Sequence, residues 1–96
     1  MIKLVEVCEI LNTNSTKQYI LREVYVNPKH VVSLREEVGY QKKLHEGLLP
    51  ENLDSRQQFT RVTLDKGQSG LEVVVIGAPH LVDNKLNGGE KRVLKG

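Results

Sequence analysis

Hydrophobic and polar residues alternate only imperfectly over the first quarter of the chain, but the length of its apolar segments and their valine and isoleucine content favour β-strands over a helix. Residues 1–11 and 18–26 are rich in valine, isoleucine and leucine, and both faces of each segment mix apolar side chains with charges. We therefore expect two strands whose faces are both partly covered. The small polar residues 12–16 lie between them and predict a hairpin loop, because such side chains hydrogen-bond to their own backbone.

Three further strands are expected downstream. An Asn-Pro dipeptide ends the second strand, because proline fixes φ and lacks an N–H. Residues 30–38 are then apolar at first and charged toward their end, and they predict a third strand. Residues 59–65 alternate again and lead into a glycine-containing turn at 65–70. Residues 71–76 are almost continuously apolar, which is typical of a central strand covered on both faces.

Two segments depart from the strand pattern. Residues 39–58 form a long, polar insertion in which Tyr40 and three leucines have the spacing of a short amphipathic turn of helix. The simplest interpretation is a flexible hairpin tip, and the alternative is a functional loop. Residues 80–86 have helical spacing after Pro79, and the Asn-Gly-Gly at 87–89 is expected to end that helix.

The order of these elements predicts a mainly β (α+β) fold. We expect a small curled antiparallel sheet of about five strands with one short C-terminal helix. The single domain would span residues 1–89, with the insertion at 39–58, and a loosely ordered basic tail would follow at 90–96.

Size and composition narrow the class of protein. The 96 residues are 39% hydrophobic and only 4% aromatic, so one small core must be built from valine, leucine and isoleucine. The net charge of +2 argues against a histone-like protein and against an acidic DNA mimic. A core of this size supplies only a few kcal/mol of net stability, and we therefore expect a homo-oligomer.

Cysteine content and apolar runs bear on location. Cys8 is the single cysteine, which excludes a disulfide within the chain and favours a reducing compartment. The longest apolar run is far short of the ~20 residues of a membrane span, and residues 1–7 lack the pattern of a signal peptide. We expect a cytoplasmic protein that does not act on membranes.

The segment 24–34, in which an Asn-Pro ends one strand and a second follows at once, resembles a pattern in very short bacterial and phage proteins. A Thr-x-Val-x-Leu strand at 60–64, a glycine turn, a valine-rich strand and a short helix follow in the same order. Small flagellar-operon proteins of the FlbD type share a similar skeleton. The resemblance covers about half of the chain and implies a phage-type accessory protein in a bacterial cell, although the insertion departs from the flagellar type.

Motifs of common enzymes and metal sites are missing from the sequence. It contains no CxxC, HExxH, GxxxxGK[ST] or GxGxxG. His30, His45 and His80 lack the spacing of metal ligands, and Cys8 within a strand is best interpreted as a small buried hydrophobic residue. We expect no enzyme, no metal and no cofactor.

A candidate binding site combines basic residues near the insertion with the start of the C-terminal helix. A strand that ends at Gly77 and leads into a helix N-terminus favours anions, although Pro79 removes one donor. The alternatives are an ordinary strand-to-helix turn and a solvated mixed-charge face. The candidate ligand-binding residues are Tyr40, Lys42, Lys43, Arg56, Arg61 and His80.

These observations favour a non-enzymatic binding module. The sequence predicts a phage-type accessory or host-counteracting protein that sequesters a small anionic ligand, such as a signalling nucleotide, or occludes a host protein. The alternatives are a nucleic-acid-binding regulator and a structural subunit of an assembly such as a virion or flagellum. An enzyme that uses one of the three histidines is the least supported hypothesis.

Overall fold

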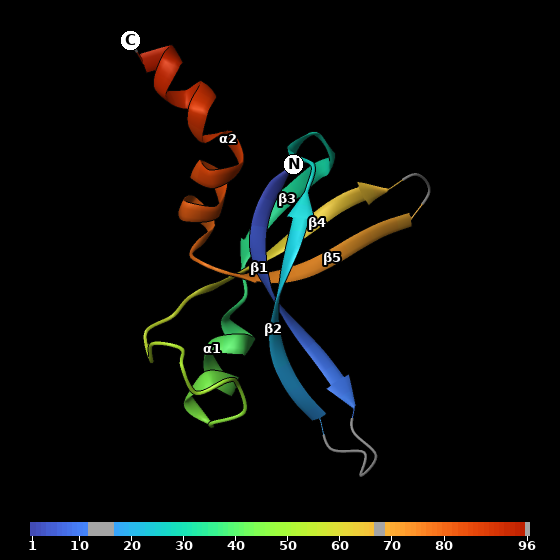
Figure 1. The fold of residues 1–96 in the computed structure, drawn as a ribbon, viewed down its shortest axis with the longest axis vertical. Coiled ribbons are helices and arrows are strands. Elements are labelled where there is room, and N and C mark those ends of the chain that lie inside the picture. Colours follow the sequence, from blue (N-terminus) through green and yellow to red (C-terminus); the bar gives the residue numbers. More distant parts are fainter. Residues whose placement is uncertain (12–16, 67–68, 96) are drawn as a thin grey trace.

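Two long antiparallel hairpins cross each other and form most of the sheet (Figure 1). The computed structural model describes residues 1–11, 17–66 and 69–95. The first hairpin pairs β1 (Ile2–Leu11) with β2 (Lys17–Val26), and the second pairs β4 (Phe59–Lys66) with β5 (Ser69–Ile76). The predicted loop at 12–16 and the middle of the predicted turn, 67–68, lie outside the described residues.

The hairpins join where Glu6 of β1 pairs with Val75 of β5. A fifth strand, β3 (Val31–Glu36), adds to the far side of β4, so the order across the sheet is β2-β1-β5-β4-β3. All pairings are antiparallel and the sheet does not close, because β2 and β3 remain at its two edges. The predicted fold class, a small antiparallel sheet of five strands with a C-terminal helix, is confirmed.

The third strand is shorter than the 30–38 expected from the sequence. His30 belongs to a 3-10 turn, η1 (Pro28–His30), in which Asn27 accepts a hydrogen bond from the N–H of Lys29 at 3.0 Å. Val38 already begins the first α-helix, α1 (Val38–His45).

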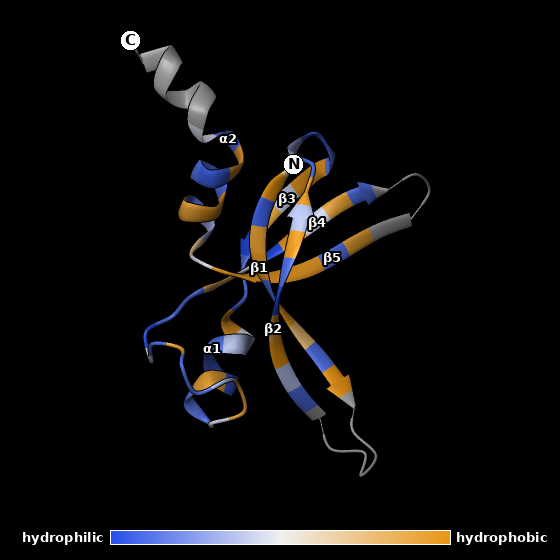
Figure 2. Ribbon diagram, viewed as in Figure 1, coloured by the Kyte–Doolittle hydropathy of each residue, from blue (hydrophilic) through white to orange (hydrophobic). Residues whose placement is uncertain are grey.

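The central strand β5 is buried on both faces, as its apolar run predicts. Val73 and Val75 point to one face of the sheet, and Val74 and Ile76 point to the other. Figure 2 shows this apolar stretch crossing the middle of the sheet. Each face therefore needs its own cover, and the chain supplies two.

The first face is covered by the C-terminal helix, α2 (Pro79–Lys95). We call the buried residues on this face the aliphatic core. They are Leu4, Val26, Val62, Val73, Val75, Val82 and Leu86.

The second face is covered by α1 and the residues that follow it. We call its buried residues the aromatic core, and they are Val7, Tyr19, Leu49, Phe59 and Val74, with Tyr40, Leu44 and Leu53 packed against them. The interpretation of residues 39–58 as a flexible hairpin tip is therefore wrong. Leu49 is only 5% exposed, because this segment folds back over the sheet and buries most of its leucines, although Leu48 stays 50% exposed.

The helix α2 is longer than predicted, since it continues through the Asn-Gly-Gly at 87–89 to Lys95. A glycine ends a helix when its φ turns positive, as φ does at Gly47 (78°) after α1, whereas Gly88 lies within α2. The residues after it are mostly strong helix formers, which offset the cost of about 1 kcal/mol per helical glycine. The expected tail is therefore helical over 90–95.

None of the helices in the described ranges is long and apolar enough to cross a membrane.

Candidate functional site

The six residues predicted to bind a ligand do not converge on one site. Tyr40 lies on the inner side of α1, where its ring centroid is 5.8 Å from that of Tyr19 and 5.9 Å from that of Phe59. Burial, followed by the neighbouring Tyr19 hydroxyl, raises the pKa of Tyr40. Tyr40 is therefore a partly buried packing residue, and Tyr25, which is 60% exposed, is the most exposed aromatic residue.

The two lysines of α1 belong to its last turn. The Nζ atom of Lys43 lies 5.4 Å from the ring centroid of Tyr40, within the range of a cation–π contact. Lys42 is exposed. Positive charges at this end of a helix complement its dipole, so the position of both lysines has a structural explanation.

Arg61 forms an ion-pair cluster with two carboxylates. Its Nε atom lies 2.6 Å from Oε1 of Glu37 and its Nη1 atom lies 2.9 Å from Oε1 of Glu72. The hydrogen bond to Glu37 raises the pKa of the half-buried Arg61 guanidinium. Because both carboxylates neutralise its charge, Arg61 connects β4, β5 and the start of α1 rather than offering a cation to a ligand.

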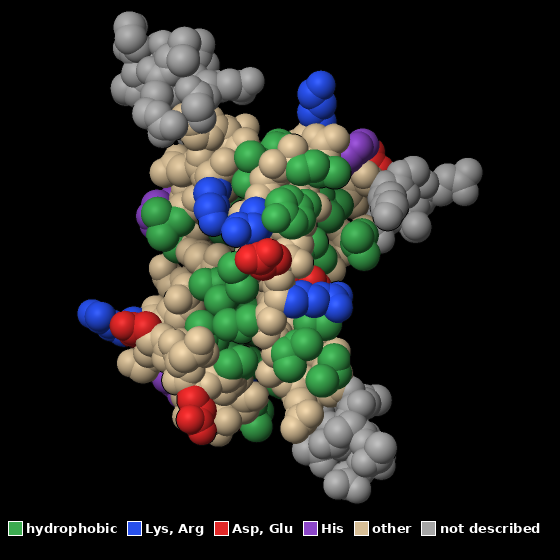
Figure 3. Space-filling model, in the orientation of Figure 1, with side chains coloured by type: hydrophobic (Ala, Val, Ile, Leu, Met, Phe, Trp, Pro, Cys, Tyr) green, Lys and Arg blue, Asp and Glu red, His purple; other side chains and the backbone are tan. Residues whose placement is uncertain are grey.

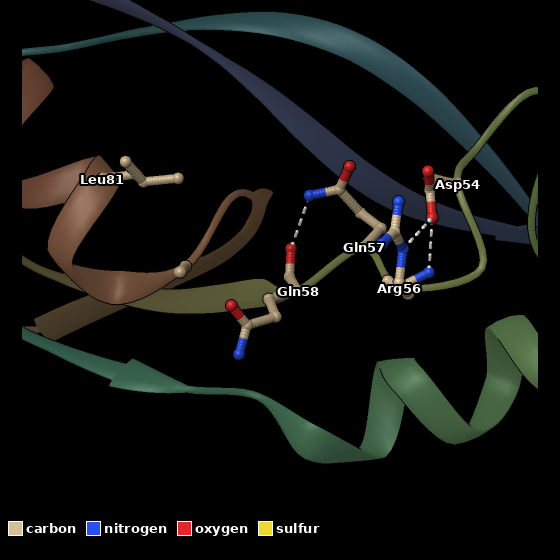
Figure 4. A pocket seen from close by; sticks show the side chains of 6 residues that line it. Asp54, Arg56, Gln57, Gln58 and Leu81 are labelled. Atoms are coloured by element: carbon tan, nitrogen blue, oxygen red, sulfur yellow. Dashed lines mark hydrogen bonds and ion pairs between the residues drawn. The ribbon is translucent and has the colours of Figure 1, made fainter.

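Arg56 and the start of α2 do come together. Figure 4 shows Arg56 beside Asp54 at one side of a cavity and Leu81 of α2 at the other. The cavity has a volume of about 400 Å³, and its lining residues are Asp54, Arg56, Gln57, Gln58, Ala78 and Leu81. His80 is the exposed neighbour of Leu81 in the first turn of α2.

The conformation of residues 54–58 follows from local hydrogen bonds. Oδ1 of Asp54 accepts the backbone N–H of Arg56 at 2.7 Å and lies 3.4 Å from its Nε atom. The backbone hydrogen bond is the main cause that lowers the pKa of Asp54, and the carboxylate stays ionised near neutral pH. The Nε2 atom of His45 lies 3.0 Å from the carbonyl oxygen of Ser55, which connects this loop to the end of α1.

Hydrogen bonds at Gly77 connect the two walls of the cavity. Its N–H donates to the carbonyl of Gln58 at 2.8 Å, and its carbonyl accepts the hydroxyl of the buried Thr60 at 2.7 Å. Ala78, which directly precedes α2, has no side-chain atom that can accept a backbone N–H. The N–H groups of Leu81 and Val82 both reach its carbonyl oxygen at 3.0 Å.

Sequence reasoning missed five of the six lining residues: Asp54, Gln57, Gln58, Ala78 and Leu81. No motif marks them. The available signal was positional, because residues 57–58 directly precede β4, and β4 pairs with the strand that leads into α2. Antiparallel pairing therefore places the start of β4 beside the end of β5.

Charged side chains elsewhere are dispersed. On the face seen in Figure 3, Lys and Arg side chains lie among acidic and apolar ones rather than in one patch. Within the ranges that the structure describes, no three His, Cys, Asp or Glu residues lie close enough to hold a metal ion.

Comparisons of the chain with protein-family models, curated proteins and solved structures find no match.

Proposed function

We propose that the protein is a non-enzymatic binding module that takes up a small anionic ligand in the cavity between residues 54–58 and the start of α2. The observation that carries this proposal is the position of Arg56, whose side chain is 89% exposed at the cavity. Asp54 engages only its Nε atom, so the terminal N–H groups of the guanidinium remain available. Such a fork binds phosphate or carboxylate oxygens in pairs.

The other lining groups suit the body of such a ligand. The volume of about 400 Å³ falls within the range of small-molecule sites, and Ala78 and Leu81 offer an apolar wall. One N–H of Gln57 donates to the carbonyl of Gln58, and one N–H of Gln58 donates to Glu36, which leaves the second N–H of each amide. An anionic group joined to a planar or apolar body, as in a nucleotide, matches this set.

A calorimetric titration tests the proposal. Inorganic phosphate and a panel of mononucleotides, dinucleotides and cyclic nucleotides are titrated into the chain. Arg56→Ala is expected to weaken binding at least about tenfold, because a charge-assisted hydrogen bond contributes about 1.5–3 kcal/mol.

Arg35→Ala is the matched control, since Arg35 is also exposed but lies on β3 away from the cavity lining. Equal affinities for the two variants, or no binding of any ligand in the panel, would contradict the proposal. The homo-oligomeric state, the bacterial cytoplasm as location and the phage-type origin stay predictions.

A further inference from the structure

The outer edge of β3 has unpaired backbone groups. Glu37, which directly follows the strand, donates its N–H to the carbonyl of Phe59 at 2.9 Å. Residues with backbone groups that point to the partner strand alternate with residues whose groups point away from it along an antiparallel strand. Because Glu37 points to β4, Arg35 does so as well, whereas the backbone groups of Leu34 and Glu36 point outward. Within residues 1–11, 17–66 and 69–95, no other strand pairs with this edge.

A cleft lies between this edge and α2. One cavity of about 400 Å³ is lined by Pro28, residues 31–34 of β3, and Asp83, Leu86 and Asn87 of α2. A second, of about 530 Å³, shares Pro28, Leu86 and Asn87 with the first and adds Lys29 and Lys85 among others. We call the two together the edge cleft. It shares no lining residue with the cavity beside Arg56.

The helix α2 forms the second wall of the edge cleft through residues 83–88. Leu86 anchors it in the aliphatic core. Val32 offers an apolar side chain that is 65% exposed at the strand side of the cleft. A strand edge with a helix beside it is the geometry in which an extended peptide adds a strand, with backbone hydrogen bonds on one side and side-chain contacts on the other.

The charges of the edge cleft indicate the kind of peptide. Lys29 and Lys85 are exposed and form no ion pair with any residue in the described ranges. Asp83 is the one acidic residue among the lining residues of the two cavities, and the hydrogen bond that its carboxylate accepts from the side-chain amide of Asn87 at 2.9 Å leaves its negative charge in place. Two cations and one anion leave the lining with a net positive charge, which favours acidic residues in a bound peptide. A second copy of this chain would instead bring the same two cations to the junction.

We propose that the edge cleft binds an extended, acidic segment of a partner protein, which adds to β3 as a sixth strand and contacts Lys29 and Lys85 with its carboxylates.

The test starts with a display library of random dodecapeptides selected on the immobilised full-length chain. Enriched peptides that carry acidic residues are expected. They are then synthesised with a fluorescent label, and their affinities are measured by fluorescence polarisation. In the wild-type chain, bound peptide is expected to slow hydrogen exchange at the amides of Leu34 and Glu36, because both N–H groups become paired.

Two sets of variants separate the backbone from the charges. Glu36→Pro removes the outward N–H and Glu36→Ala keeps it, while both lose the same side-chain contact with Gln58. Glu36→Pro is expected to weaken binding at least about tenfold relative to Glu36→Ala. The double variant Lys29→Glu, Lys85→Glu is likewise expected to bind the peptide at least about tenfold more weakly than the control Lys42→Glu. Lys42 is an exposed lysine on α1.

Several results would overturn the proposal. These are the absence of enriched peptides, enrichment of basic ones, or unchanged exchange at Leu34 and Glu36. Sedimentation of the chain alone supplies a further one. If the wild type is a dimer and Glu36→Pro makes it monomeric while Glu36→Ala does not, a second copy occupies the edge instead.

Discussion

The two faces of the sheet carry covers of different character. On one face, α1 and the residues after it enclose Phe59, which is fully buried, together with Tyr19 and Leu49. On the other, α2 buries Val82 and Leu86 within residues 79–88, the part of the helix whose side chains are described. The α1 face therefore has a core of aromatic rings and leucines, whereas α2 packs on the other face through a narrow apolar stripe.

The polar contacts reinforce this difference. Arg61 connects the sheet to the start of α1 through Glu37, whereas α2 is held at its beginning by the hydrogen bonds of Gly77. Both proposed binding sites border α2, one at its first turn and one along the edge of β3. A cover attached along a narrow stripe leaves open space on either side of it. From this difference we expect the larger single-residue losses of stability on the α1 face, and both proposed ligands on the α2 face.

The largest test of this difference compares one core residue from each face. Phe59→Ala is expected to lower the free energy of unfolding by about 3–5 kcal/mol, because it empties the centre of the aromatic core. Leu86→Ala is expected to cost about 2–3 kcal/mol. Urea denaturation followed by circular dichroism measures both. Should Phe59→Ala fail to fold, Phe59→Leu is compared with Leu86→Val instead, and a larger loss for the Leu86 variant within the same pair would contradict the comparison.

A smaller effect is expected at the ion pairs of the α1 face. Arg61→Ala leaves the half-buried carboxylate of Glu37 without its closest cation and should lower the free energy of unfolding by about 1–3 kcal/mol. Arg22→Ala is the control, because its ion pair with Glu6 involves a 60% exposed arginine and is expected to contribute less than about 1 kcal/mol. Urea denaturation measures both variants. Equal losses of unfolding free energy would mean that the Arg61 ion pairs stabilise the fold no more than an exposed surface pair does.

The smallest effect appears only in alkaline solution. Burial raises the pKa of Tyr40, so the folded chain holds the phenolic proton more tightly than the unfolded chain. This contribution to stability is complete below the ordinary pKa of 10.0 and is lost as pH rises through the raised value. Tyr40→Phe should match the wild type at pH 7 and lose less stability above pH 10. Thermal unfolding of both proteins from pH 7 to above pH 10 checks this prediction. Melting temperatures that fall equally with pH in the two proteins would contradict it.

Local pattern was sufficient for most of the secondary structure. The alternation in residues 59–65 and the apolar run at 71–76 predicted β4 and the doubly covered β5, because each depends only on which side chains point to which face. Helix length was harder to predict, since a glycine pair ends a helix in one context and is tolerated in another.

The candidate site was predicted less well, for a physical reason. Arg61 and Tyr40 look like free surface groups in the sequence, but Glu37, Glu72, Tyr19 and Phe59 come from distant parts of the chain and occupy them. Arg56 remained available because its partner, Asp54, is only two residues away and engages a single nitrogen of the guanidinium.

Five strands, their antiparallel sequence of hairpins and a C-terminal helix were thus determined by the chain's own hydrophobic period and turn residues. Tertiary structure alone decided which face each cover protects, which charges are neutralised and where open space remains. Periodicity is a local property that every strand carries in its own residues. Ion pairs and cavities, by contrast, depend on side chains that are brought together only when the sheet curls and its covers pack.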